Sequence, residues 1–294
     1  MAAKLEHLLD DTRRSLAARD TGDFAVKEAL LLASLHPKQR DFVLDPGRRI
    51  AALVARRGGK TTGGRVRFLR RMMQQRKATC VYIALSRPHA EELMWSPLKE
   101  MAEQLGLAAK FNETKLKMTL TRNGSELQLL GADDKAEVEK LRGRKFHEAG
   151  IDEGASHRKH LLESLIFRIL GPGLTDYRGP LWITGTPGHL LSGPFYDVTK
   201  VGTEIGRPYG ERKRADFTDW MGWSTHSWSL QDNVSQPHLW EEALREKAAN
   251  AWSDDNPIWR REYLGQWVTD DTGYVYKFRA HHPETGAPWN IWTP

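Results

Sequence analysis

The segment 54–64 reads VARRGGKTTGG and comes close to a phosphate-binding loop. Such a loop follows G-x-x-x-x-G-K-[ST], in which backbone N–H groups and the lysine hold phosphates and the hydroxyl binds Mg²⁺. Gly59, Lys60 and Thr61 match the pattern, but Val54 stands where its first glycine belongs. From this segment alone, a nucleotide site with a variant loop competes with a basic loop at the start of a helix.

The neighbouring patterns favour the nucleotide site. IAALV at 50–54 is a short apolar run without alternation, which is typical of a strand buried on both faces. The segment 60–75 follows with apolar residues at helical spacing. A strand, a glycine-containing turn and a lysine at a helix start form the required context, because a helix N-terminus attracts phosphate. Lys60 would then reach the β- and γ-phosphates, and Thr61 would bind Mg²⁺.

Two adjacent carboxylates follow another predicted strand. FHEAGIDE ends in Asp152 and Glu153, about ninety residues after Lys60. In ATPases with a parallel sheet, an aspartate at this place holds the Mg²⁺ shell, and the next glutamate orients and deprotonates the attacking water. An isolated Asp-Glu pair is usually a solvated turn. The order strand, GKT, helix, strand, Asp-Glu is what gives this pair its value.

A third segment, LWITGTP at 181–187, predicts a buried strand that ends in hydroxyl-bearing residues. Thr184, Gly185 and Thr186 suit the γ-phosphate end of a nucleotide site, although alone they fit a strand running into a turn. Together, the three segments predict a P-loop NTPase that carries its catalytic glutamate beside the Walker B aspartate.

The remaining patterns predict an α/β fold of the RecA-like (ASCE) P-loop type, with a mostly parallel central sheet flanked by helices. Further strands are expected at 78–85 and in a hairpin around Asn123-Gly124, and further helices at 88–105 and 160–170. Nine of the eleven tryptophans lie beyond position 200, where QPHLWEEALREKAAN and NPIWRREYLGQW predict short helices. We expect these tryptophans to form a compact aromatic core of a small helical subdomain rather than a base-stacking platform.

Composition excludes several classes of protein. The 294 residues contain no apolar run long enough to span a membrane, and the N-terminus lacks the apolar segment of a signal peptide. One cysteine, Cys80, excludes an internal disulfide framework, fits a reducing compartment and is expected to be buried. The net charge of +6 is compatible with a polyanionic partner.

Basic and histidine clusters carry weaker predictions. Three basic clusters are each more typical of a solvated face but collectively fit sequence-independent DNA binding: Arg48-Arg49, Arg70-Arg71 and Arg212-Lys213-Arg214. The pairs His157/His160 and His281-His282 lack a complete set of metal ligands, so we expect them at the surface.

With these residues in view, the chain resembles the large subunit of the tailed-bacteriophage terminase, over about 36–278. HPKQRDFV is similar to the family segment whose glutamine, here Gln39, meets the adenine. ARRGGKT resembles the divergent Walker A of that family, with Arg56 or Arg57 as the arginine inside the loop. EKLRGRKFHEAGIDEGAS is similar to the Leu-Arg-Gly and Walker B segments, which makes Arg142 a candidate for sensing or stabilising the γ-phosphate. TGTP resembles the coupling motif.

The resemblance implies an ATP-hydrolysing motor domain that uses Mg²⁺ to translocate double-stranded DNA into a procapsid. The implied partners are a portal protein, the small terminase subunit and further copies in a homo-oligomeric ring, in the host cytoplasm and with no membrane. Catalytic roles fall on Glu153, Lys60 and Arg142. Thr61 and Asp152 are the implied Mg²⁺ ligands. The implied coupling motif consists of Thr184, Gly185 and Thr186. The implied nucleotide-binding residues are Gln39, Arg56, Arg57, Gly58, Gly59, Lys60, Thr61 and Thr62.

The expected division of the chain is a helical segment at 1–35, the ATPase core at 36–215, a helical lid at 216–270 and, by the resemblance, a linker at 271–294 toward a nuclease domain absent from this sequence. Asp270 and Asp271 are interpreted as structural, and no nuclease activity is expected. A superfamily-2-like helicase and a non-catalytic DNA-binding assembly protein are the alternatives. The helicase would need a second nucleotide-binding lobe, for which too few residues follow TGTP.

Overall fold

The computed structural model describes residues 24–200 and 222–268. The first 23 residues of the helical segment predicted at 1–35, the basic cluster at 212–214, Asp270, Asp271 and the pair His281-His282 lie outside these ranges. Among the described residues, no helix is long and apolar enough to cross a membrane.

The centre of the fold is one sheet in the order β3-β4-β5-β2-β6-β7-β1-β8. β3 and β4 pair antiparallel with their neighbours, and every other pair is parallel. The predicted mostly parallel α/β sheet is therefore confirmed. The strands are β1 (Arg49–Val54), β2 (Thr79–Ala84), β3 (Ala109–Asn112), β4 (Lys117–Leu120), β5 (Glu126–Gly131), β6 (Glu148–Ile151), β7 (Leu181–Gly185) and β8 (Ser224–Trp228).

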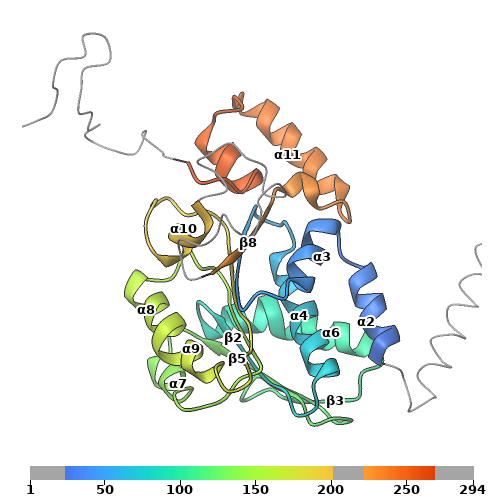
Figure 1. The fold of residues 1–294 in the computed structure, drawn as a ribbon. Coiled ribbons are helices and arrows are strands. Elements are labelled where there is room, and N and C mark those ends of the chain that lie inside the picture. Colours follow the sequence, from blue (N-terminus) through green and yellow to red (C-terminus); the bar gives the residue numbers. More distant parts are fainter. Residues whose placement is uncertain (1–23, 201–221, 269–294) are drawn as a thin grey trace, which may run out of the picture.

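Helices cover both faces of this sheet (Figure 1). One face carries α2 (Phe24–Ala33), α3 (Pro37–Leu44), α4 (Lys60–Gln74), α5 (Arg87–Ala90), the π-helical turn η1 (Glu91–Trp95) and α6 (Ser96–Gln104). The other carries α7 (Lys135–Glu139), α8 (Lys159–Ser164), the π-helical turn η2 (Leu165–Leu170), α9 (Gly171–Gly173) and α10 (Pro194–Thr199). Each face buries its own apolar cluster, as expected of strands that are apolar on both sides.

The last described segment adds the 3-10 turn η6 (Leu230–Asp232), α11 (Pro237–Ala249) and the π-helical turn η7 (Trp259–Tyr263). A small third apolar cluster forms here, in which Trp240 and Trp252 pack beside Trp259. This is the aromatic packing that the sequence predicts. Trp228 and Trp267, however, join the two clusters of the main sheet.

The structure corrects two expectations. β8 lies in the segment that we expected to be helical, yet it pairs parallel with β1 and closes one edge of the sheet. His157 is buried rather than at the surface, because its ring hydrogen-bonds the main chain of the Asp152 loop. The predicted hairpin between β4 and β5 is confirmed. Burial of Cys80 is also confirmed.

Candidate nucleotide site

The loop after β1 bends where the Walker A pattern requires it. Val54 is the last residue of β1, is fully buried and pairs with Trp228 of β8, so the chain is still extended there. The turn follows over 55–59, with left-handed backbone at Arg57 (φ 59°) and Gly59 (φ 81°), and α4 begins at Lys60. A valine therefore replaces the first glycine without strain, because the chain is still a buried strand at this position.

The backbone donors of this loop fall into two sets. The N–H groups of Ala55, Arg56 and Gly58 are bound to carbonyls of Trp228, Glu262 and Ala55, at 3.0, 2.8 and 3.0 Å. No partner is found among the described residues for the N–H groups of Gly59, Lys60 and Thr61. These donors open the helix N-terminus, where the helix dipole adds positive potential. They form a cradle suited to phosphate.

The predicted catalytic pair is in direct contact. Lys60 Nζ lies 2.7 Å from Glu153 Oε1, and both side chains are largely buried. Burial disfavours the charged ammonium, but the charges of Asp152 and Glu153 outweigh it and raise the pKa of Lys60. Glu153 has left-handed backbone (φ 54°), which a residue with a side chain adopts only when its surroundings hold it there.

Asp152 is the most constrained carboxylate of the site and is 1% exposed. Thr61 Oγ1 donates to its Oδ2 at 3.2 Å, and Thr184 Oγ1 donates to its Oδ1 at 2.7 Å. Thr184 comes from the predicted coupling segment at the end of β7. Residues after β1, β6 and β7 thus meet at one edge of the sheet, as carboxyl ends of parallel strands do.

Thr61 and Asp152 supply the hard oxygen donors that Mg²⁺ prefers. Among the described residues, no cluster of three or more His, Cys, Asp or Glu side chains offers a complete protein site for a metal. The pair fits Mg²⁺ nevertheless, because this ion is usually held by one or two protein oxygens together with phosphates and water.

Two further contacts to the Asp152 loop were missed from the sequence. Tyr82 on β2 donates its hydroxyl to Asp152 Oδ2 at 2.8 Å. Burial and the neighbouring Asp152 raise the pKa of Tyr82 well above its usual value, so the phenol stays protonated and remains a donor. His157 hydrogen-bonds the carbonyl of Asp152 at 2.9 Å. Tyr82 looked like one apolar residue of a buried strand, and no sequence signal placed its hydroxyl at the site.

Sequence comparison now identifies the family. The model of the N-terminal part of the terminase large subunit, T4likevirus-type, matches residues 52–281. The chain belongs to this family. It is the ATPase motor domain of a terminase large subunit, a protein of phage DNA packaging.

Solved structures have the same fold. A variant of the large terminase ATPase domain of Thermus phage P74-26 is 19% identical with a TM-score of 0.62, over 81% of this chain and 97% of that one. The ADP complex of the large terminase from the thermophilic bacteriophage D6E is 17% identical with a TM-score of 0.57, over 80% of this chain and 54% of that one. The HK97 bacteriophage large terminase is 16% identical with a TM-score of 0.55, over 79% of this chain and 50% of that one.

The terminase domain thus spans about half the length of the D6E and HK97 proteins. No curated protein matches its sequence. Membership of the terminase family sets aside the helicase and the non-catalytic assembly protein that the sequence left open.

Among the described residues, the side chains of Arg142, Arg56 and Gln39 make no hydrogen bond or ion pair with Asp152 or Glu153. Arg142 is exposed and pairs with Glu139, and its Nη1 donates to the Arg168 carbonyl at 3.3 Å. Arg56 is exposed, and its Nε lies 2.8 Å from Glu262. Gln39 is 4% exposed and uses both ends of its amide within the protein: its nitrogen donates to the Gly59 carbonyl, and its oxygen accepts from the His36 N–H. Its predicted contact with adenine stays a prediction.

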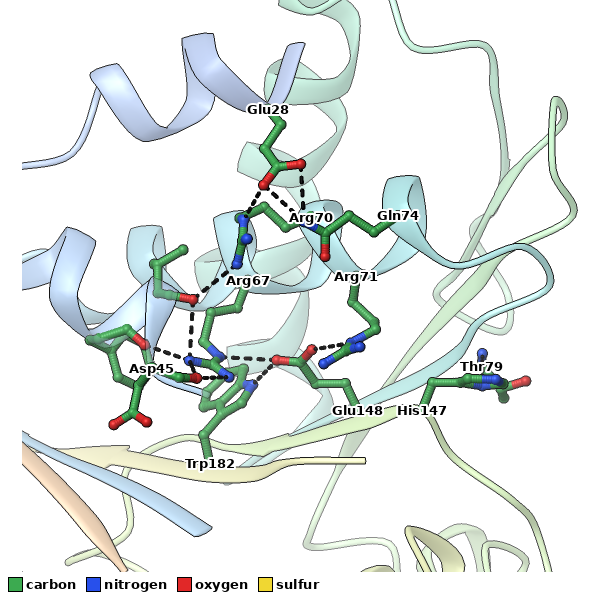
Figure 2. Close-up of polar contacts among 12 residues, drawn as sticks. Glu28, Asp45, Arg67, Arg70, Arg71, Gln74, Thr79, His147, Glu148 and Trp182 are labelled. Atoms are coloured by element: carbon green, nitrogen blue, oxygen red, sulfur yellow. Dashed lines mark hydrogen bonds and ion pairs between the residues drawn. The ribbon is translucent and has the colours of Figure 1, made fainter. Parts of the chain in front are cut away.

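A buried ionic network joins the elements that carry the three motifs (Figure 2). Glu148 at the start of β6 accepts from Arg67 and Arg71 of α4 at 3.0 and 3.1 Å, and from the Trp182 indole of β7 at 3.1 Å. We call Glu148, Arg67, Arg71 and Trp182 the brace. The basic pair Arg70-Arg71 is part of this structural network rather than a free surface patch, since Arg70 pairs with Glu28.

Proposed function

We propose that the terminase domain hydrolyses MgATP at the convergence of Lys60, Thr61, Asp152 and Glu153, and that this turnover drives double-stranded DNA into a procapsid. The observation that carries the proposal is the pair of contacts Lys60–Glu153 at 2.7 Å and Thr61–Asp152 at 3.2 Å, beside loop N–H groups that have no partner within residues 24–200 and 222–268. The D6E structures with ADP and with ATP-γ-S support a nucleotide in this family.

In the proposed reaction, the phosphates accept hydrogen bonds from the N–H groups of Gly59, Lys60 and Thr61. The Lys60 ammonium leaves Glu153 for the β- and γ-phosphate oxygens, which frees the carboxylate. Glu153 then takes a proton from a water molecule whose oxygen attacks the γ-phosphorus, and the bond to the bridging β–γ oxygen breaks to give ADP and phosphate. Mg²⁺, when held by Thr61 and Asp152, neutralises charge that develops on the phosphates.

Asp152 requires a fixed orientation in this reaction. Thr184 and Tyr82 each donate to a different oxygen of its carboxylate, so the two oxygens cannot rotate freely. Because Thr184 lies in the segment TGTP, the orientation of Asp152 is linked to the end of β7. We propose that Thr184, Gly185 and Thr186 transmit the state of the nucleotide site to the rest of the domain.

We propose that Arg142 and the loop arginines act on the nucleotide from the protein surface. Arg142 has no contact with the Lys60 cluster among the described residues, and its guanidinium is exposed. An exposed arginine is better placed to reach the nucleotide of a neighbouring copy in a ring than the nucleotide bound by its own chain. The test is turnover per chain measured at several protein concentrations. We expect it to rise with concentration in the wild type and not in Arg142→Ala. Turnover independent of concentration in both proteins contradicts it.

The partners of the proposed motor are DNA, a portal protein, the small terminase subunit and further copies of the chain. The main test of the function is MgATP binding and phosphate release by the wild type and Lys60→Ala. Loss of binding in the variant supports the proposal, because removal of the ammonium leaves only the backbone donors. Equal binding and turnover in both proteins refutes it. Trp95→Phe, a substitution in the core away from the loop, is the matched control.

A further inference from the structure

Three consecutive carbonyls of the phosphate loop accept hydrogen bonds from side chains that lie outside the loop. The Asn233 amide donates to the Arg57 carbonyl at 3.1 Å. The Trp228 indole donates to the Gly58 carbonyl at 2.6 Å. The Gln39 amide donates to the Gly59 carbonyl at 2.7 Å. These donors come from the α3 helix, from β8 and from the turn after it, and α3 and β8 lie side by side at the edge of the sheet.

The orientation of these carbonyls decides where the loop donors point. In a trans peptide, the C=O of one residue and the N–H of the next point in opposite directions. The bond from Trp228 to the Gly58 carbonyl therefore turns the Gly59 N–H to the opposite side. The Gly59 carbonyl accepts from Gln39 and from the Gly63 N–H of α4, and these two bonds together do the same for the Lys60 N–H. These two N–H groups are among the loop donors that find no partner in the part of the chain that the structure describes.

The two glycines of the loop fit the same donors. A Cβ on Gly58 would lie 2.6 Å from Val54 Cγ1 and 3.1 Å from Trp228 Nε1. A Cβ on Gly59 would lie 2.3 Å from Gln39 Nε2, at a backbone angle that side chains rarely adopt. Gln39 thus occupies the space that a side chain on Gly59 would need, and Val54 together with Trp228 occupies the space that a side chain on Gly58 would need. Loop and donors form one matched arrangement.

Adjacent glycines leave a loop with many accessible conformations, and each must be given up when phosphate binds. Holding the loop from outside before the ligand arrives removes part of this cost, which is how preorganisation raises affinity. Burial supports such a role, since Gln39 is 4% and Trp228 is 2% exposed. Edge-to-face contact with His36 and packing against Phe42 fix the Trp228 ring.

We propose that Gln39 and Trp228 are positioning residues, which hold the N–H groups of Gly59 and Lys60 in the orientation that binds phosphate. The proposal rests on the function proposed above for this loop. It gives Gln39 a role that needs no contact with the base. It also gives β8, the strand at the edge of the sheet, a direct part in nucleotide affinity.

The test compares Trp228→Phe, which removes the indole donor and keeps a ring, with Gln39→Met, which keeps the length of the side chain. Titration calorimetry with MgADP and steady-state MgATP hydrolysis are measured on the whole chain. One lost hydrogen bond is worth about a tenfold change in affinity. We expect Kd and KM to rise about tenfold in each variant while kcat stays within about threefold, because the loop holds ground state and transition state alike.

Trp95→Phe is the matched control, because Trp95 is equally buried and gives its indole hydrogen to Glu113, away from the loop. A thermal melt of each variant without nucleotide separates folding from binding. If Trp228→Phe does not fold, Gln39→Met decides the matter. Wild-type affinity in the folded variants, with nucleotide binding still lost in Lys60→Ala, overturns the positioning role and leaves the proposed function standing. Absence of nucleotide binding in the wild type overturns both.

Discussion

Removal of one partner of the brace is predicted to destabilise the domain strongly. Arg67 and Glu148 have side chains that are 4% and 3% exposed, and their atoms Nε and Oε1 are 3.0 Å apart. The remaining Arg67 donors bond the carbonyls of Val43 and Asp45 at the end of α3. Glu148→Gln keeps the shape of the side chain but leaves a buried guanidinium without a counter-charge. Breaking a buried pair in this way costs about 3–5 kcal/mol.

The loss of stability in Glu148→Gln can be measured as a fall in the melting temperature and in the urea midpoint. A loss of this size lowers Tm by roughly 6–20 °C in a domain of this length. The double variant Arg67→Met/Glu148→Met removes the buried guanidinium together with its counter-charge and leaves only the partly exposed Arg71 without its carboxylate, so it is expected to recover at least half of the single-variant loss. Single variants that each cost less than about 1 kcal/mol would refute the reasoning, because a solvated pair has that value. A double variant as unstable as the sum of the singles would refute the pairing.

Two further predictions concern residues around the site. Gly150→Ala should lower the unfolding free energy of the domain in urea by about 1–3 kcal/mol, because a Cβ there would lie 2.2 Å from the Trp182 ring. An unchanged unfolding free energy would contradict this packing. For Asp45, burial opposes ionisation, but hydrogen bonds from His226, Ser224 and the Gly47 N–H outweigh it and lower the pKa from 3.8 to about 2. A lowered pKa stabilises the fold above pH 4 by about 2 kcal/mol, and this is lost as the pH falls from about 4 to about 2. In Asp45→Asn the unfolding free energy should lack this part of the pH dependence, and equal pH profiles would contradict it.

The convergence of the site residues was largely predictable because it depends on short patterns in a fixed order. GKT, the Asp-Glu pair and TGTP each follow an apolar run, and parallel strands must bring their carboxyl ends to one edge. Even the valine at 54 carried information, because it belongs to the strand rather than to the turn. Local sequence therefore predicted which residues meet, although not how they are held.

The supports of the site were not predictable, because they depend on contacts between distant segments. β8 reads STHSW and has no apolar run, and only Trp228 of this edge strand is buried. The burial of Arg67 in α4 could not be predicted, since helical spacing does not reveal a counter-charge eighty-one residues away. His157 was expected at the surface because no metal ligands accompany it, yet it is buried and hydrogen-bonds the carbonyl of Asp152. In each case, the polar side chain is satisfied by a partner that no local pattern identifies.

In the proposed reaction, Glu153 removes the proton from the attacking water while Lys60 binds the phosphates. The most direct test is phosphate release at saturating MgATP by the wild type and by Glu153→Gln, with MgATP affinity measured on the same samples. Glu153→Gln keeps the size of the side chain and loses the base. If Glu153 is the base, we expect affinity within about threefold of the wild type and turnover lower by about 10²–10⁴. Turnover within a few-fold of the wild type would contradict it.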